Sequence, residues 1–313
     1  MLLKEAIHEY LLAVRQAGRS DATLYCYQWH LDRMAAWLED QKGTTRLEDV
    51  TRSDLRTWGG GLRDRWSPAT IRQATIAVRS LLRWCHEEGL TETNLAKALK
   101  VPKVKQRIQR TLSGEEIMTL MSQCDTTSSI GKRNQALVAL LADSGLRSAE
   151  VCRLRVCDLD LDNQRLQVIA KGGAEEVAYF GRVCRKYLTA WLDDRERVAA
   201  PGVQTVFVSI GGIIPGQPFT TSGLRVILRK LGQRAGVPGV SPHAFRRAFA
   251  TQMVYNGAST RVVMETGRWD DIAMVQLYTR ALRVQEMFQR YSPIDRLTRE
   301  NLQPSLFDVT SSL

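Results

Sequence analysis

The sequence predicts a mainly α-helical protein with one small β-hairpin, divided into two domains. Apolar residues recur every three or four positions through most of the chain, as they do in helices that bury one face. Two short β-like runs, 166–170 and 176–180, flank a Lys-Gly-Gly sequence that is typical of a hairpin turn. A chain of 313 residues is long enough for about two domains that each bury a core.

Composition and charge restrict the classes of protein to which the chain can belong. No run approaches the ~20 apolar residues that cross a bilayer, and the charged N-terminus is unlike a signal peptide, so we expect a cytoplasmic protein without a membrane partner. The six cysteines include no C-x-x-C pair, so we expect reduced thiols and no metal site. Lysine and arginine outnumber acidic residues by 44 to 33, and this net charge of +11 favours a polyanionic partner such as nucleic acid.

Residues 1–92 are expected to form a helical domain. Its four helices are expected over about 3–14, from Ser20 or Asp21 onward, from Thr51 or Ser53 to the glycines at 59–61, and from Pro68 to about 88. The last of these helices carries Arg72, Arg79 and Arg83 within about 40° of one line, opposite its apolar stripe. Such a row is either a solvated polar face or a face that contacts phosphates.

Residues 93–112 are expected to form an extended basic linker between the domains, because they contain Pro102 and no acidic residue. The basic residues of this stretch are Lys97, Lys100, Lys103, Lys105, Arg107 and Arg110. A charge run is usually only solvated. Because this run joins two domains of a basic protein, we expect it to lie along nucleic acid.

Residues 113–313 are expected to form the second domain. It begins with Ser113 and a glutamate three positions later, which is the sequence of a capping box. A short strand is expected over 205–209. Helices are expected at about 114–124, 131–143, 182–199, 221–235, 242–256, 260–266, 271–279 and 283–290.

Four segments of the second domain carry chemically active residue types. They are Gly-Leu-Arg147 followed by Glu150, Lys171 before two glycines, His243-x-x-Arg246, and Trp269 with Tyr278 nine positions later. Each segment alone has a structural explanation, such as a helix cap, a turn lysine, a common pair on one helix face or a buried core tyrosine.

Together and in this order, the four segments resemble the active site of the tyrosine recombinase (phage integrase) family. The run from Ser67 to Gly89 also resembles the core-binding domain of that family. The resemblance implies a SAM-like core-binding domain at 1–92 and a mixed α+β catalytic domain at 113–313 with a C-terminal exchange tail. We expect the two-domain layout of Xer-like or Cre-like proteins, because the chain has no room for the extra arm-binding domain of lambda-type integrases.

The resemblance implies a role for each residue of the pattern. Arg147 and Arg246 would hold the non-bridging oxygens of a DNA phosphate and stabilise the transition state with no metal or cofactor. Tyr278 would attack phosphorus and leave a 3′-phosphotyrosyl link and a free 5′-hydroxyl. Tyr291 is the rival nucleophile, but its spacing from Trp269 does not fit the family pattern.

Proton transfer is implied for two further residues. Lys171 matches the family's general acid toward the 5′-oxygen, and His243 is the candidate base toward the tyrosine. Trp269 stands where histidine is commonest and can donate one N–H to a phosphate oxygen but transfer no proton. Glu150 matches the acid that braces the site from behind, although an ordinary surface glutamate is the alternative. Arg268 occupies a position where glycine is usual, which leaves the local turn geometry open.

These expectations describe a site-specific DNA recombinase that acts through a Holliday junction, in integration, excision or resolution. The family implies a homotetramer on two double-stranded DNA sites, with a second recombinase or accessory factor as an open alternative. Residues 283–313 are expected either to insert into a neighbouring subunit through the apolar side of 281–288 or to pack on their own domain. The rival functions are a type IB topoisomerase-like nicking-closing enzyme and a catalytically inactive DNA-binding accessory protein.

Overall fold

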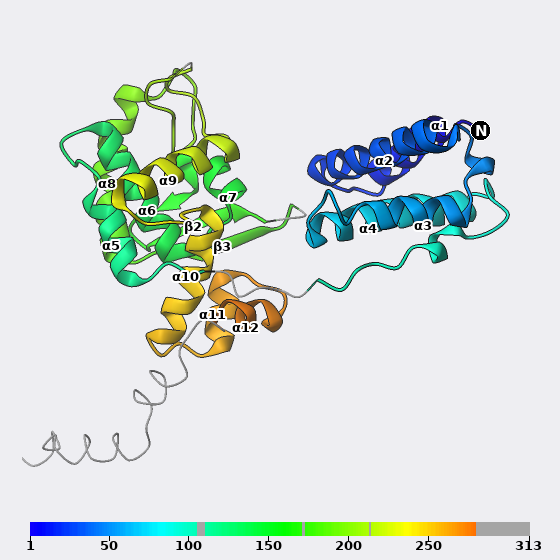
Figure 1. The fold of residues 1–313 in the computed structure, drawn as a ribbon. Helices are drawn as coiled ribbons and strands as arrows, with labels where there is room; N and C mark the ends of the chain where they lie inside the picture. Colours follow the sequence, from blue (N-terminus) through cyan, green and yellow to red (C-terminus); the bar gives the residue numbers. More distant parts are fainter. Residues whose placement is uncertain (105–109, 171–172, 213, 280–313) are drawn as a thin grey trace, which may run out of the picture. The chain divides into compact units, whose positions relative to one another are not determined.

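The computed structural model describes residues 1–104, 110–170, 173–212 and 214–279. The chain forms two compact units, Met1–Arg107 and Ile108–Leu313. Each unit has its own hydrophobic core, and Figure 1 shows the helices and strands of each.

The N-terminal unit is a bundle of four helices, as the sequence predicts. The helices are α1 (Leu3–Gln16), α2 (Asp21–Lys42), α3 (Arg52–Gly61) and α4 (Pro68–Glu87), with 3-10 turns at η1 (Leu47–Asp49) and η2 (Leu95–Ala98). Ser20, Thr51 and Ser67 cap α2, α3 and α4 by accepting a backbone N–H from the first turn. Helix α2 packs on α1 and α4, and their apolar stripes meet in a core that includes Leu31 and Leu81.

The expected extended linker differs from the structure at its start. Residues Leu95–Ala98 form η2, and Leu95, Ala96 and Leu99 are buried in the N-terminal core. The reason is the hydrophobic effect, because burying these apolar side chains in the core lowers the free energy relative to leaving them in water along an extended chain. Arg79 of α4 also holds the end of η2 in place, since its Nη1 donates to the carbonyl of Leu99 at 2.9 Å.

The C-terminal unit is built around helix α6. Its helices are α5 (Gly114–Ser122), α6 (Ser129–Ser144), α7 (Ser148–Arg153), α8 (Arg182–Val198), α9 (Thr221–Ala235), α10 (Pro242–Tyr255), α11 (Thr260–Gly267) and α12 (Ile272–Thr279), with a 3-10 turn η3 (Val156–Asp158). Helix α6 is buried along most of its length and packs on α5, α8 and α10. Trp191 of α8 and Phe245 of α10 fill the space beside it. The sequence predicts all of these helices except α7.

A small antiparallel sheet adjoins this core. Its strands are β1 (Leu159–Asp160), β2 (Arg165–Ile169) and β3 (Glu175–Tyr179), in the order β1-β2-β3. The predicted hairpin is confirmed one residue earlier than expected on both strands, and β1 was not predicted. Alternate residues Leu166, Val168 and Ala178 face the core, as the two-residue period of a strand requires. The strand expected over 205–209 does not form: Thr205 and Val208 make only isolated bridges, to Arg155 and Pro218.

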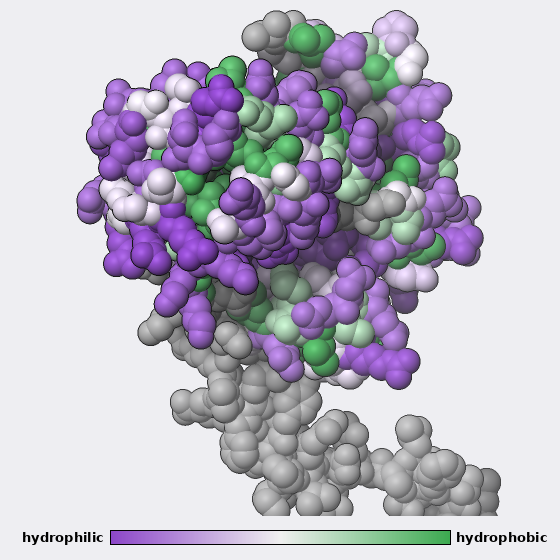
Figure 2. Space-filling model, turned by 90° about the vertical axis from the view of Figure 1, so that its right-hand side faces the viewer, coloured by the Kyte–Doolittle hydropathy of each residue, from purple (hydrophilic) through white to green (hydrophobic). Residues whose placement is uncertain are grey.

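The surface shows no continuous apolar belt on the face drawn in Figure 2, where hydrophobic residues form separate patches among hydrophilic ones. Within the described part of the chain, no helix is both long enough and apolar enough to cross a membrane.

Candidate active site

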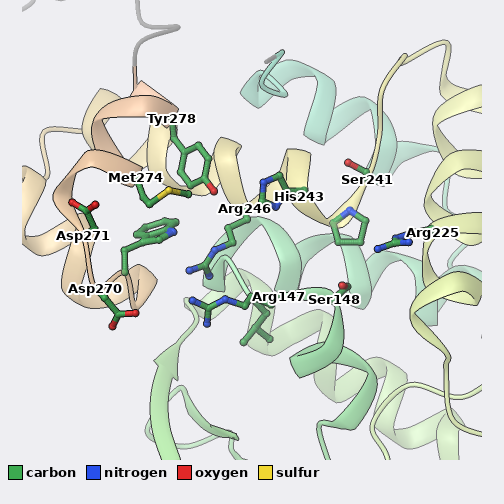
Figure 3. A pocket seen from close by; sticks show the side chains of 13 residues that line it. Arg147, Ser148, Arg225, Ser241, His243, Arg246, Asp270, Asp271, Met274 and Tyr278 are labelled. Carbon is green, nitrogen blue, oxygen red and sulfur yellow. The ribbon is translucent and has the colours of Figure 1, made fainter. Parts of the chain in front are cut away.

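Five of the predicted site residues line one cavity of about 640 Å³ in the C-terminal unit. They come from helices α10 and α12, from the turn between α6 and α7, and from the turn between α11 and α12 (Figure 3). These residues are Arg147, His243, Arg246, Trp269 and Tyr278. Arg225 and Ser241 also line the cavity. Sequence reasoning gave neither residue a role. Arg225 reaches the cavity through the packing of α9 on α10, and Ser241 lies two positions before His243.

Arg147 is positioned by the tight turn that ends helix α6. Gly145 ends α6 with φ 58°, and a Cβ on it would lie 2.6 Å from the ring of Phe249, so only glycine fits there. The side chain of Arg147 donates from Nη1 to Glu150 Oε1 at 2.8 Å, and its backbone N–H donates to Oε2 at 2.8 Å. The side chain is still 37% exposed, which leaves its outer edge available to a ligand.

Arg246, on helix α10, is buried. Its Nη1 donates to the carbonyl of Gly145, its Nη2 donates to the carbonyl of Gly267 at 2.7 Å, and the guanidinium lies 4.4 Å from the centre of the Trp269 ring. Burial, together with the nearby charge of Arg147, lowers the pKa of Arg246 to about 10, so it remains charged at neutral pH. Because its partners are neutral carbonyls, the cation is oriented but its charge is not neutralised. An anion in the cavity would therefore be attracted.

Tyr278 closes one side of the cavity. Its side chain is buried, and its ring meets His243 edge-on at 6.0 Å and Trp269 at 5.7 Å. Its hydroxyl points toward His243 and Arg246 (Figure 3). The hydroxyl of Thr251 donates to the Tyr278 carbonyl at 3.1 Å and so fixes this turn of α12.

The pKa values of this tyrosine and of His243 are shifted in opposite directions. Burial raises the pKa of Tyr278, although the charges of Arg246, Arg247 and Arg147 act against it, so the phenol is protonated at neutral pH. Partial burial, followed by the charges of Arg247 and Arg246, lowers the pKa of His243. The imidazole is therefore neutral near pH 7. A neutral imidazole beside a protonated phenol has the protonation states that a general base and its nucleophile need.

Trp269 forms the wall between Arg246 and Tyr278. It packs in a small cluster with Phe249, Val263 and Val275. A Cβ on Gly267 would lie 1.8 Å from the indole ring, so this glycine is required for the tryptophan to sit where it does. The only signal for Gly267 in the sequence is its place two residues before Trp269.

Arg268 resolves the turn geometry that the sequence left open. It caps α11 in the left-handed conformation, with φ 55° and ψ 57°. Its buried side chain donates from Nη2 to Glu150 Oε2 at 2.9 Å, and its Nε lies 3.2 Å from Glu176 Oε2. Burial by itself would raise the pKa of Glu150, but hydrogen bonds from Arg147 and the charge of Arg268 lower it.

The remaining predicted residues lie elsewhere. Lys171, Lys105 and the apolar tail at 281–288 fall outside the described residues. Five of the predicted DNA-contact residues are exposed on the N-terminal unit: Arg72, Arg83, Lys97, Lys100 and Lys103. Arg79 is half-buried and held by the Leu99 carbonyl. In the described segments, no three histidine, cysteine, aspartate or glutamate side chains are grouped to hold a metal.

Comparison with known proteins identifies similar sequences and folds over nearly the whole chain. The model of the phage integrase family matches residues 110–284, and the model of the phage integrase N-terminal SAM-like domain matches residues 7–89. The tyrosine recombinase XerD of Lacticaseibacillus casei is 32% identical over 280 residues, covering 89% of this chain and 93% of the relative. The tyrosine recombinase XerC of Corynebacterium efficiens is 31% identical over 290 residues, covering 91% and 89%.

Solved structures share the fold at lower sequence identity. The XerH site-specific recombinase bound to a palindromic difH substrate, in a post-cleavage complex, matches with a TM-score of 0.71 at 18% identity, covering 87% of this chain and 80% of that one. The Tn1549 transposon integrase in complex with circular intermediate DNA matches with a TM-score of 0.66 at 17% identity, covering 91% and 98%.

Proposed function

The chain belongs to the phage integrase family of tyrosine recombinases and is a site-specific DNA recombinase, and from this premise we propose that Tyr278 is its nucleophile. One observation carries the proposal. The Tyr278 hydroxyl points into a cavity where two arginines and a neutral histidine converge. This arrangement fits attack on a DNA phosphate, because such a phosphate needs charge neutralisation and its attacker needs a base.

The two arginines are proposed to bind the scissile phosphate. Arg147 presents its exposed edge to the cavity, and Arg246 presents a charge that no carboxylate of the described residues neutralises by direct pairing. Forked guanidinium donors match the non-bridging phosphate oxygens and stabilise the charge that develops on them. In this step, Trp269 fixes the guanidinium of Arg246 from the side and keeps water from that face of the pocket.

The proposed reaction exchanges one phosphodiester bond for another. The bond between Tyr278 Oη and phosphorus forms as the bond from phosphorus to the 5′-oxygen breaks. His243 accepts the phenolic proton, and Lys171 gives a proton to the departing 5′-oxygen. A 3′-phosphotyrosyl link retains the energy of the bond, so a 5′-hydroxyl from another strand can reverse the step without ATP.

The assembly of the recombinase is also part of the proposal. Double-stranded DNA is the partner, and a homotetramer on two DNA sites exchanges strands in sequence through a Holliday junction, with a second recombinase or an accessory factor where the two sites differ. The proposed place of action is the cytoplasm. The exposed cations of the N-terminal unit, such as Arg72 and Lys103, support binding to the DNA backbone.

A nicked suicide substrate tests the proposed function. Duplexes that the chain binds are first selected from fragments of the genome that encodes it, and a nick is then placed beside each candidate cleavage point. The wild-type chain is expected to form a covalent protein–DNA adduct, and Arg147→Ala is expected to lose it. Arg153→Ala is expected to keep it, because Arg153 is an exposed arginine at the end of α7, the helix that Arg147 precedes. A chain that binds these duplexes and never forms the adduct would contradict the proposal and favour an inactive accessory protein.

A further inference from the structure

Residue 268 holds a backbone conformation that suits glycine better than arginine. Arg268 and Gln164 are the two non-glycine residues with positive φ in the described segments. A side chain with a Cβ is disfavoured in this left-handed region, whereas glycine enters it freely. Arginine at this position therefore needs a compensating contribution from the side chain itself.

The backbone of this turn serves both phosphate-binding arginines. The carbonyl of Arg268 accepts from Arg147 Nη2 at 3.3 Å and lies 3.5 Å from Arg246 Nη2. The preceding carbonyl, that of Gly267, accepts from Arg246 Nη2 at 2.7 Å. The left-handed turn thus directs two consecutive carbonyls toward the guanidinium groups, and a glycine at position 268 would serve this purpose equally well.

The side chain of Arg268 does something that glycine cannot do. It is 4% exposed, does not line the cavity, and lies between two carboxylates. One is Glu150, 3% exposed, whose other oxygen accepts from Arg147 Nη1. The other is Glu176 of strand β3, which pairs with Val168 of β2 in the hairpin.

The contact with Glu176 has the character of an ion pair more than of a directed hydrogen bond. The two atoms are 3.2 Å apart, yet within the described residues neither Glu176 Oε2 nor Arg268 Nε has a hydrogen-bond partner of good geometry. Buried polar atoms without such partners are costly, so substitution on either side of this contact should have a measurable effect.

We propose that Arg268 is a positioning residue that links the β2–β3 hairpin to the phosphate-binding arginines through Glu176 and Glu150. The turn of this hairpin carries Lys171, which lies outside the described residues. The inference rests on the proposed function, in which Lys171 protonates the leaving oxygen. Arg268 then holds the base of the hairpin against the site and holds Glu150 against Arg147, so that acid and phosphate-binding groups keep one spacing.

Leaving-group chemistry provides a readout that loss of folding would not imitate. In a substrate whose bridging 5′-oxygen is replaced by sulfur, the leaving thiolate needs no proton, because a thiol has a pKa of about 8.5. Variants that misplace the general acid should therefore cleave oxygen-bridged DNA slowly and sulfur-bridged DNA at the normal rate. Lys171→Ala sets the reference for complete loss of the acid.

The experiment measures single-turnover cleavage of both substrates by Glu176→Gln, Arg268→Gly and the double variant. Glu176→Gln is expected to slow cleavage of oxygen-bridged DNA by about 10- to 100-fold, the scale of a small misplacement of a reacting group. Its DNA affinity should be unchanged, and it should cleave sulfur-bridged DNA at the normal rate. Glu175→Gln is the matched control, because this neighbouring glutamate lies on the exposed face of β3. The double variant is expected to be no slower than Arg268→Gly alone, because both substitutions break the same contact between Arg268 and Glu176.

The outcomes separate the inference from the function on which it rests. If Lys171→Ala is rescued by sulfur but Glu176→Gln is equally slow on both substrates, or is as fast as wild type, the link is wrong and the proposed chemistry stands. If Lys171→Ala itself is equally slow on both, the acid role of Lys171 and the inference fail together. Strictly additive effects of the two substitutions would also overturn the link.

Discussion

Arg246 is held by Gly267, since its Nη2 donates to the Gly267 carbonyl at 2.7 Å, 21 positions along the chain. The same guanidinium donates to the carbonyl of Gly145. Two backbone carbonyls from separate turns therefore fix the orientation of this cation and leave its charge for a ligand. The site is thus assembled on turns whose glycines are required by close packing.

Arg246→Lys should lower the rate of DNA cleavage by about 10²–10³-fold, the usual cost of removing one preorganised donor from a transition state. Lysine retains the charge but lacks the fork that reaches the two carbonyls and the phosphate together. Single-turnover adduct formation on a nicked duplex measures the effect. A rate within a few-fold of wild type would show that charge alone is sufficient at this position.

Gly267→Ala should abolish cleavage and lower the melting temperature, because the added Cβ would lie 1.8 Å from the Trp269 ring. The indole must move, and it can do so only by disturbing Arg246 or Tyr278. Gly60→Ala is the control. No atom lies within 4 Å of a Cβ at that helical position, so alanine should stabilise helix α3 by about 0.5–1 kcal/mol. Equal melting temperatures for the two variants would contradict this account.

The pH dependence of cleavage should reflect the lowered pKa of His243. A base acts only when unprotonated, and its pKa lies below the usual value of 6.5, so the rate should fall as pH drops through a range below 6.5 and be level above it. The pKa of Tyr278 lies above its usual value of 10.0, so no further rise is expected between about pH 7 and 9. His243→Asn should lower the plateau and remove the acid limb. An acid limb centred above pH 6.5 would contradict the assignment.

Two arginines of helix α4 should behave differently when replaced by alanine. Arg79→Ala should destabilise the protein by about 0.5–1.5 kcal/mol, because the half-buried side chain donates to the Leu99 carbonyl. Arg83→Ala should leave the melting temperature unchanged and reduce the slope of log affinity against log salt by about 0.9, as expected for one lost phosphate contact. Thermal melts and DNA titrations at several salt concentrations distinguish these results.

The sequence was sufficient for most of the helices, because periodic apolar positions are local signals. It was also sufficient for five of the residues that line the cavity, because four motifs in this order resemble a known family. Contacts between distant segments left no such signal. The partnership of Arg268 with Glu150 spans 118 positions, and the burial of Leu95 and Leu99 within a basic run depends on the core of another segment. Short elements such as β1 and α7 were missed because they are defined by neighbours more than by their own residues.

Mapping a trapped protein–DNA adduct identifies the attacking residue. Wild-type protein is incubated with a nicked duplex, the complex is digested with protease and nuclease, and mass spectrometry locates the residue that carries the nucleotide. The account predicts modification of Tyr278 alone, and DNA binding without any adduct for Tyr278→Phe, which lacks only the attacking oxygen. A nucleotide on Tyr291, or an adduct that persists in Tyr278→Phe, would contradict it.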